Sequence, residues 1–244
     1  NLILQNLGSD YQYYIFYEKD ALDPNIDIYG TGLYSVIIDL NQNAGLGKVK
    51  NIDNLVIDDS LRLCHLTSTR HANGRDWWVL INRFYTNQYY RLLITPQGIE
   101  NHGIQTIGTK VYQGVGQSVF SPDVRFFCSF DDVGGQFGSY LDIYDFDRCT
   151  GLLSNHRQQH DVVSWGGIAI SPNSRYLYHN FFSKAYQYDL EAPDVLASKT
   201  EVATWDGYQS PSPTHFFTMQ LAPDGKIYSA AFNRSDILHV IHHP

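Results

Sequence analysis

The sequence predicts an all-β fold, and three observations lead to that prediction. Aromatic residues make up 14% of the 244 residues, and charged residues only 17%, which is below the roughly 25% of an average soluble protein. Aromatic and β-branched side chains favour strands. Four aromatic-rich segments recur at a nearly fixed spacing, and none of the units they define contains a long helical pattern free of Gly, Pro and strand formers.

The recurring segments start at residues 71, 121, 171 and 222, so they are spaced by 50, 50 and 51 residues. They read HANGRDWWVL (71–80), SPDVRFFCSF (121–130), SPNSRYLYHN (171–180) and APDGKIYSAA (222–231). Each begins with a turn tetrapeptide, continues with a basic residue and ends in an apolar strand. The Asn-Gly and Asp-Gly pairs are turn signals, because Gly tolerates a positive φ.

Further strands are predicted on both sides of each turn. The strand before the turn reads VGQSVF (115–120), WGGIAI (165–170) and FFTMQL (216–221). The strand that follows the apolar strand of each recurring segment reads YYRLLIT (89–95), YLDIYDF (140–146), KAYQYDL (184–190) and ILHVIHH (237–243). A more polar fourth strand follows in the complete units. The N-terminal part fits the same order, with LILQ, YQYYIFY (11–17), LYSVIIDL (33–40) and a polar strand near residues 48–57.

Four short strands repeated every 40 to 50 residues are typical of β-propeller blades. The sequence therefore predicts a single propeller domain over residues 1–244, built of four-stranded antiparallel blades. We expect about five blades, at residues 1–57, 61–108, 115–160, 164–205 and 216–244, with the last one incomplete. One blade cannot bury both faces of its sheet alone, so we expect the aromatic residues to pack between neighbouring blades.

The segments YYIF (13–16), GLYSVIIDLNQNAGLGKV (32–49), RHANGRDWWVL (70–80), YDFDRCTGLLSN (144–155), SPNSRYLY (171–178) and QLAPDGKIY (220–228) resemble the WD40/YVTN-like propellers of bacterial secreted surface proteins. Those proteins often carry type IX secretion or gliding-motility-associated C-terminal sorting domains. The resemblance implies export to the cell surface, flanking domains in the same polypeptide and a longer propeller of six or seven blades. It brings no catalytic residues.

The repeat separates structural residues from candidate site residues, because a residue type that recurs in several blades serves the blade. Asp39, Asp145 and Asp189 all end a third strand, where a carboxylate can accept backbone N–H groups. The basic residues after the turns are expected along the strand rim; they are Arg75, Arg125, Arg175 and Lys226. Trp77 and Trp78 are interpreted as packing residues. The cysteines are interpreted as small apolar fillers in or near strands; they are Cys64, Cys128 and Cys149.

The remaining candidates lie in segments interpreted as loops on one face of the propeller, at residues 18–30, 57–60, 130–138, 156–161 and 206–215. That face is predicted to be acidic and to attract a cation or a basic partner. The predicted binding residues are Asp58, Asp59, Asp131, Asp132, His156, His160, Asp206 and His215.

Metal binding is predicted only weakly. Asp23, Asn25 and Asp27 have the alternating spacing of oxygen ligands for calcium. The match is partial, because Ile28 stands where Gly is preferred and Tyr34 stands where a bidentate carboxylate is needed. An ordinary polar loop is the alternative. His239, His242 and His243 fall on both faces of a strand, so no zinc set is predicted and no other cofactor is expected.

Composition excludes some classes of function. The chain has 17 Lys and Arg against 25 Asp and Glu, so nucleic acid is not an expected partner. The opening NLILQN does not read as a signal peptide, and no apolar run reaches the roughly 18 residues of a membrane span. There is no GxSxG, HExxH or phosphate-binding loop.

We therefore predict a non-enzymatic, secreted or cell-surface module that presents loops to a protein or glycan. One alternative is a hydrolase or lyase acting on polysaccharide through carboxylates of the acidic face, for example Asp131 or Asp132 with Asp58. A second alternative is a structural spacer in an adhesin or filament. A fold alone does not decide between these functions.

Overall fold

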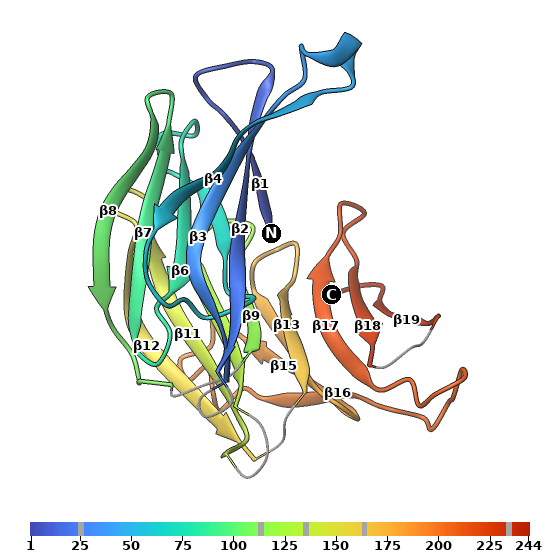
Figure 1. Cartoon of the computed structure of the whole chain (residues 1–244). Coiled ribbons are helices and arrows are strands. Elements are labelled where there is room, and N and C mark those ends of the chain that lie inside the picture. The colour runs from blue at the N-terminus through green and yellow to red at the C-terminus, as the bar shows by residue number, and fades with distance from the viewer. Residues whose placement is uncertain (24–26, 112–114, 134–136, 163–164, 233–235) are drawn as a thin grey trace. The chain divides into compact units, whose positions relative to one another are not determined.

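The computed structural model consists of antiparallel sheets without an α-helix in the part of the chain that it describes (Figure 1). The description covers residues 1–23, 27–111, 115–133, 137–162, 165–232 and 236–244. A 3₁₀ turn lies at Asn43–Gly45. None of the described helices is long and apolar enough to cross a membrane.

The described residues form five sheets, and in each of them strands that follow one another in sequence are neighbours. The first contains β1 (Leu2–Gln5), β2 (Gln12–Asp23), β3 (Asp27–Asp39) and β4 (Lys48–Ile57). The second contains β5 (Thr67–Arg70), β6 (Trp77–Asn82), β7 (Gln88–Thr95) and β8 (Gly98–Thr106). The third contains β9 (Val115–Phe120), β10 (Phe126–Asp132), β11 (Ser139–Asp147) and β12 (Leu152–Asp161). The fourth contains β13 (Gly166–Ile170), β14 (Tyr176–Phe181), β15 (Lys184–Asp189) and β16 (Thr200–Thr204), and the three-stranded fifth contains β17 (Phe216–Leu221), β18 (Ile227–Ala231) and β19 (Leu238–Ile241). The prediction of repeated antiparallel sheets is confirmed.

The chain divides into two compact units. The first comprises Asn1–Val115 with Asp147–Ser154, and the second comprises Gly116–Phe146 with Asn155–Pro244. In the first unit, the first and second sheets bury a shared apolar core whose members come from β1 to β4, β6, β7 and the segment after β4. They are Leu4, Tyr14, Phe16, Leu33, Ile57, Leu61, Val79, Ile81, Leu92 and Ile94.

Two apolar clusters are formed by described residues of the second unit. The larger one joins the third and fourth sheets and consists of Phe126, Cys128, Phe130, Leu141, Ile143, Ile168, Ile170, Leu177, Phe181, Tyr188, Leu190 and Val195. The smaller one joins the fourth and fifth sheets through Ala169, Tyr178, Met219 and Ile227. Aromatic residues between neighbouring sheets thus bury much of the apolar area, as the composition predicts.

The four predicted turns share one backbone design. The amide of the fourth turn residue donates to the first residue's carbonyl in all of them. That fourth residue has a positive φ in each turn, whether it is Gly74, Val124, Ser174 or Gly225. The third residue's side-chain oxygen accepts the amide of the following basic residue at 3.0–3.1 Å, from Asn73, Asp123, Asn173 and Asp224. The turn chemistry therefore recurs even where glycine does not.

Replacing Gly74 by alanine is expected to destabilise the protein by about 1 kcal/mol, because φ is +73° there and a side chain strains that conformation. A Cβ at Gly74 would meet no atom within 4 Å, so the loss of stability in Gly74→Ala reports backbone strain and not a steric clash. The free energy of unfolding in urea checks this. Ala72→Ser in the same turn is the control, and equal stability of the two variants would contradict the prediction.

Two of the three aspartates that were predicted to accept backbone N–H groups at the end of a third strand do so. Asp39 accepts the amide of Asn41, and Asp189 accepts the amide of Glu191. The assignment of Asp145 is wrong, because its carboxylate bonds the side chains of Asn155 and Arg157. The strand runs on to Asp147, which accepts the amide of Cys149 instead.

The basic residues at the strand rim form ion pairs with nearby carboxylates, namely Arg75 with Asp76, Arg125 with Asp123 and Glu191, Arg175 with Asp189, and Lys226 with Asp224. Trp78 is 1% exposed, so its packing role is confirmed. The cysteine interpretation holds for buried Cys128 but is wrong for Cys64 and Cys149, which are exposed.

Glu18 is a carboxylate on the buried face of β2, opposite Leu33 of β3. Burial raises the pKa of Glu18 to about 7, from an ordinary value of 4.5. Between those pH values the native state binds more protons than the unfolded state, so this group lowers stability as pH rises. Glu18→Gln is expected to stabilise the protein by about 1–3 kcal/mol at pH 8 and to have little effect at pH 4.5.

Urea unfolding of the Glu18→Gln variant at the two pH values checks this, with Glu100→Gln in the same unit as an exposed control. A gain that is equal at both pH values would show that the effect does not come from the charge of Glu18.

Candidate functional site

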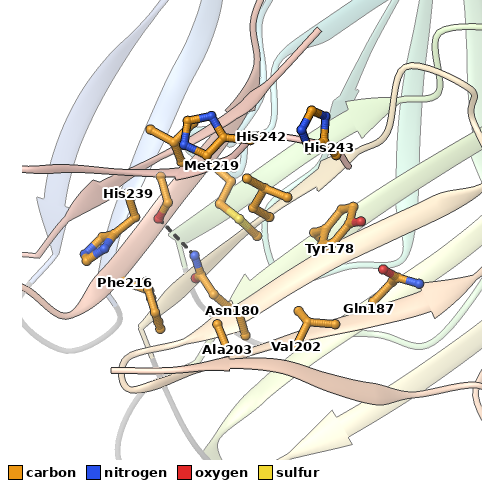
Figure 2. Close-up of a pocket in the computed structure, with 14 residues that line it drawn as sticks. Tyr178, Asn180, Gln187, Val202, Ala203, Phe216, Met219, His239, His242 and His243 are labelled. Atoms are coloured by element: carbon orange, nitrogen blue, oxygen red, sulfur yellow. Dashed lines mark hydrogen bonds between the residues drawn. The ribbon is translucent and has the colours of Figure 1, made fainter. Parts of the chain in front are cut away.

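A pocket lies in the second unit, between the fourth and fifth sheets. Its volume is about 510 Å³, and strands β14 to β19 supply its walls. Its lining includes the polar residues Tyr178 and Gln187 and the apolar residues Phe216 and Met219. Figure 2 shows Asn180 between His239 on one side and Tyr178 and Gln187 on the other. The pocket combines apolar surface with a few polar groups, as small-molecule sites do.

Asn180 fixes the floor of this pocket. It is fully buried in β14. Its amide nitrogen donates to the Phe217 carbonyl at 2.7 Å and to the Ser229 hydroxyl at 3.1 Å, the bond drawn in Figure 2. Its carbonyl oxygen accepts the Gly167 amide at 2.9 Å. These bonds join β13, β14, β17 and β18, so the floor is rigid.

A smaller pocket of about 260 Å³ adjoins the first and shares Phe216 and His239 with it. The segment between β16 and β17 lines it with Trp205, Asp206 and Thr214. The Trp205 indole nitrogen donates to the Thr214 hydroxyl at 3.2 Å, and that hydroxyl donates to the Tyr208 carbonyl at 3.0 Å. These bonds hold the segment in place, so that the Asp206 carboxylate and the Trp205 indole ring line the smaller pocket.

His239 lies at the junction of the two pockets. Its Nε2 atom is 2.7 Å from the carbonyl oxygen of Thr214. A carbonyl oxygen can only accept, so Nε2 carries a hydrogen, and in the neutral ring the lone pair is then on Nδ1. The ring also packs edge-on against Phe216, with 4.6 Å between centroids. In the neutral form of the ring, this bond selects the tautomer that can take a proton at Nδ1.

Two predicted site residues belong to this region. Asp206 lines the smaller pocket, and its Oδ1 accepts the Tyr208 amide at 2.9 Å. His215 follows the same segment and stacks on Phe182, with centroids 3.8 Å apart. Burial lowers the pKa of His215, so its ring is uncharged at neutral pH.

Asp58 and Asp59 lie in the first unit, just after β4. Asp58 is exposed. Asp59 pairs with Arg83 at 2.7 Å and accepts the Tyr90 hydroxyl at 2.6 Å. Burial, reinforced by the Asp59 carboxylate, raises the pKa of Tyr90 to about 12. A pocket of about 420 Å³ lies beside Asp59 and Arg83, whose charges already compensate each other.

The prediction that Asp131 and Asp132 lie in a loop is wrong. Strand β10 extends through Asp132, and there Asp131 pairs with Tyr140 of β11 and Asp132 pairs with Ser139 of β11. Both are buried. Asp132 accepts the Trp165 amide at 2.8 Å.

The loop positions predicted for His156 and His160 are wrong too, since both lie within β12. His156 Nε2 is 2.5 Å from Asp142 Oδ1, and the ring stacks on Tyr144. Burial raises the pKa of Asp142, and the nearby Asp131 charge adds to this, while the His156 bond opposes it. His160 bonds the Phe137 carbonyl and stacks on Tyr140. The Asp142–His156 pair was not foreseen.

The calcium candidate falls mostly outside the described residues. Asn25 is one of those undescribed residues, and of Asp23 and Asp27 the structure describes only their backbone pairing across β2 and β3. Among the side chains that are described, no three His, Cys, Asp or Glu groups are placed to hold a metal ion. Calcium binding remains a prediction.

No family model matches the chain, and no curated protein matches it either. Among solved structures, the chain is similar to a protein from Lactobacillus plantarum, with a TM-score of 0.55 and 12% identity over 87% of this chain and 62% of that one. It is also similar to a protein from Bacteroides uniformis named provisionally as a 6-phosphogluconolactonase, with a TM-score of 0.51 and 12% identity over 94% and 77% of the two chains. A third match is the periplasmic gluconolactonase of Pseudomonas aeruginosa, with a TM-score of 0.50 and 14% identity over 93% and 57%.

The fold is a β-propeller. The predicted fold class is thereby confirmed, and the five sheets are its blades. At 12–14% identity the likeness extends to the fold alone. The chain spans less than two thirds of the length of two of these propellers.

These comparisons correct the expectation of a non-enzymatic module. Two of the propellers that the chain resembles are named as lactone hydrolases. Neither the binding-only function nor the spacer is retained, and the hydrolase alternative is the better supported one. Its proposed carboxylates need revision, because Asp131 is buried in a strand and not displayed in a loop.

Proposed function

We propose that this propeller hydrolyses a lactone of the sugar-acid class and that the adjoining pockets around His239 bind it. The main supporting observation is the bond from His239 Nε2 to the Thr214 carbonyl, which in the neutral ring leaves the lone pair on Nδ1, at a residue that lines both pockets. The resemblance to propellers named as lactonases supports the reaction class.

The reaction needs one water and one base. His239 Nδ1 takes a proton from water as the water oxygen attacks the lactone carbonyl carbon. The tetrahedral intermediate collapses by breaking the bond between that carbon and the ring oxygen, and the imidazolium returns the proton to the ring oxygen. The product is the open-chain hydroxy acid, which ionises and releases one proton to solvent.

Polar groups around the larger pocket suit a hydroxylated substrate. Tyr178 lines the pocket while only 4% exposed. Burial raises the pKa of Tyr178, so its hydroxyl stays protonated and can donate. Gln187 offers both a donor and an acceptor from β15. Together they provide hydrogen bonds for the substrate's hydroxyls.

The test is ring opening of glucono-δ-lactone, followed by titrating the released acid at constant pH. The chain is expected to raise the rate above spontaneous hydrolysis in proportion to its concentration, with saturation by substrate. A rate equal to that of buffer at every substrate concentration would overturn the proposal.

We also propose that the protein acts outside the cytoplasm. The resemblance of residues 13–16, 32–49 and 220–228 to secreted surface propellers supports this, and one similar propeller is named as periplasmic. Immunodetection in fractionated source cells tests it, and recovery only with the cytoplasm would contradict it.

A further inference from the structure

Six aromatic or imidazole rings form a strip at one end of the fourth and fifth sheets. They are Trp165, Phe182, Trp205, His215, Phe217 and Phe232, and none of them is fully buried. Each lies at or next to a strand end, between β13 and β18. Trp165 is the most open of them, with 46% of its surface exposed.

The rings of this aromatic strip are continuous. The His215 ring lies 4.0 Å from Trp205 and 3.8 Å from Phe182, centroid to centroid. Phe182 lies 5.6 Å from Phe232, which lies 5.0 Å from Trp165. Phe217 packs edge-on against Phe232. The strip therefore starts at Trp205, in the wall of the smaller pocket, and leads away from it to Trp165.

The backbone holds the strip in an unusual conformation. Trp165 has φ of +65° and Phe182 has φ of +36°, a region that large side chains rarely adopt. The Phe182 amide donates to the Trp165 carbonyl at 2.9 Å, and the Phe232 amide donates to the His215 carbonyl at 2.7 Å. Asp132 anchors the Trp165 amide. Strain of this kind is kept where a preformed arrangement serves function.

Groups beside the strip are hydrogen-bond acceptors. The Asp132 carboxylate accepts the Trp165 amide, and Asp206 directly follows Trp205 in the chain. These carboxylates repel phosphates and acidic sugars and favour a ligand rich in hydroxyl donors. Pyranose rings combine such hydroxyls with C–H faces, and C–H groups pack on the negative faces of aromatic rings.

We propose that the aromatic strip binds the sugar rings of a neutral oligosaccharide whose lactone end enters the pocket at His239. The inference rests on the proposed function only for the position of the lactone. The proposed substrate is therefore larger than a single sugar acid. The aromatic strip binds the sugar rings that follow the lactone ring.

Calorimetric titration of the chain with cellopentaose and laminaripentaose tests the strip without any turnover. Saturable binding is expected for at least one of them. Trp165→Gly is the decisive variant, since glycine accepts the positive φ and preserves the fold while the ring is removed. Its affinity is expected to fall at least tenfold. Tyr11→Ala, an exposed aromatic change in the other unit, is the matched control and should bind as the unchanged chain does.

Three results would overturn the inference. They are no binding of either pentasaccharide, unchanged affinity in Trp165→Gly, and tighter binding of tetramethylammonium than of the sugars, which would mark a cation site. Loss of pentasaccharide binding in Trp165→Gly with glucono-δ-lactone turnover retained would support it. Pentasaccharide binding by a chain that opens no lactone would contradict only the proposed function.

Discussion

His239→Gln is expected to lower kcat/KM for glucono-δ-lactone by about 100-fold or more, the usual contribution of a general base. The glutamine amide can still donate to the Thr214 carbonyl, which His239 Nε2 contacts at 2.7 Å. What the variant lacks is the Nδ1 lone pair. The loss should therefore fall on kcat, while KM changes little, because the pocket keeps its shape.

Initial rates by constant-pH titration check this, after subtraction of spontaneous hydrolysis. His102→Gln is the control, because His102 is an exposed residue of the other unit and plays no part in the site. If His239→Gln kept full kcat, another group would have to be the base.

His179→Leu is expected to stabilise the protein by about 1–3 kcal/mol at pH 7, the cost of a buried polar group left unpaired. His179 is 1% exposed in β14, and neither ring nitrogen has a hydrogen-bond partner in the part of the chain that the structure describes. The ring packs on Phe130 and Phe181. An apolar side chain of similar size suits this environment better.

The stabilisation by His179→Leu is expected to increase as the pH falls below 6.5. Burial, with a smaller effect of the Lys199 charge, lowers the pKa of His179 to about 3 from 6.5. Between these values the unfolded state binds more protons, so the unchanged protein loses stability as pH falls. The difference should rise by about 1.4 kcal/mol per pH unit below 6.5.

Urea unfolding at pH 7 and pH 5 measures this gain, with exposed His102→Leu as the control. A variant less stable than the unchanged protein at pH 5 would show that His179 has a polar partner in the native state.

The repeat allowed the turns and most strands to be predicted, because the turn chemistry is local. Asn73, Asp123, Asn173 and Asp224 each cap the amide two residues on, a pattern legible in sequence. Strand ends were less predictable. Pairing with β11 carries β10 through Asp132, and no local signal marks that extension.

The site was predicted only in part. Asp206 and His215 are among the predicted binding residues, whereas the sequence marks His239 only as part of a histidine group unsuited to zinc and gives no signal for Tyr178. These residues meet only when the fourth and fifth sheets face each other. One signal was available: at the tenth position of the repeated segments, Asn180 stands where the others have Leu80, Phe130 and Ala231.

The most direct test of lactone binding is a crystal structure of the chain with gluconolactam, the amide analogue that resists ring opening. The lactam ring is expected in the pocket between the fourth and fifth sheets, with its carbonyl beside His239 and its hydroxyls at Tyr178 and Gln187. An empty pocket at saturating lactam, or lactam bound elsewhere with His239 untouched, would contradict it.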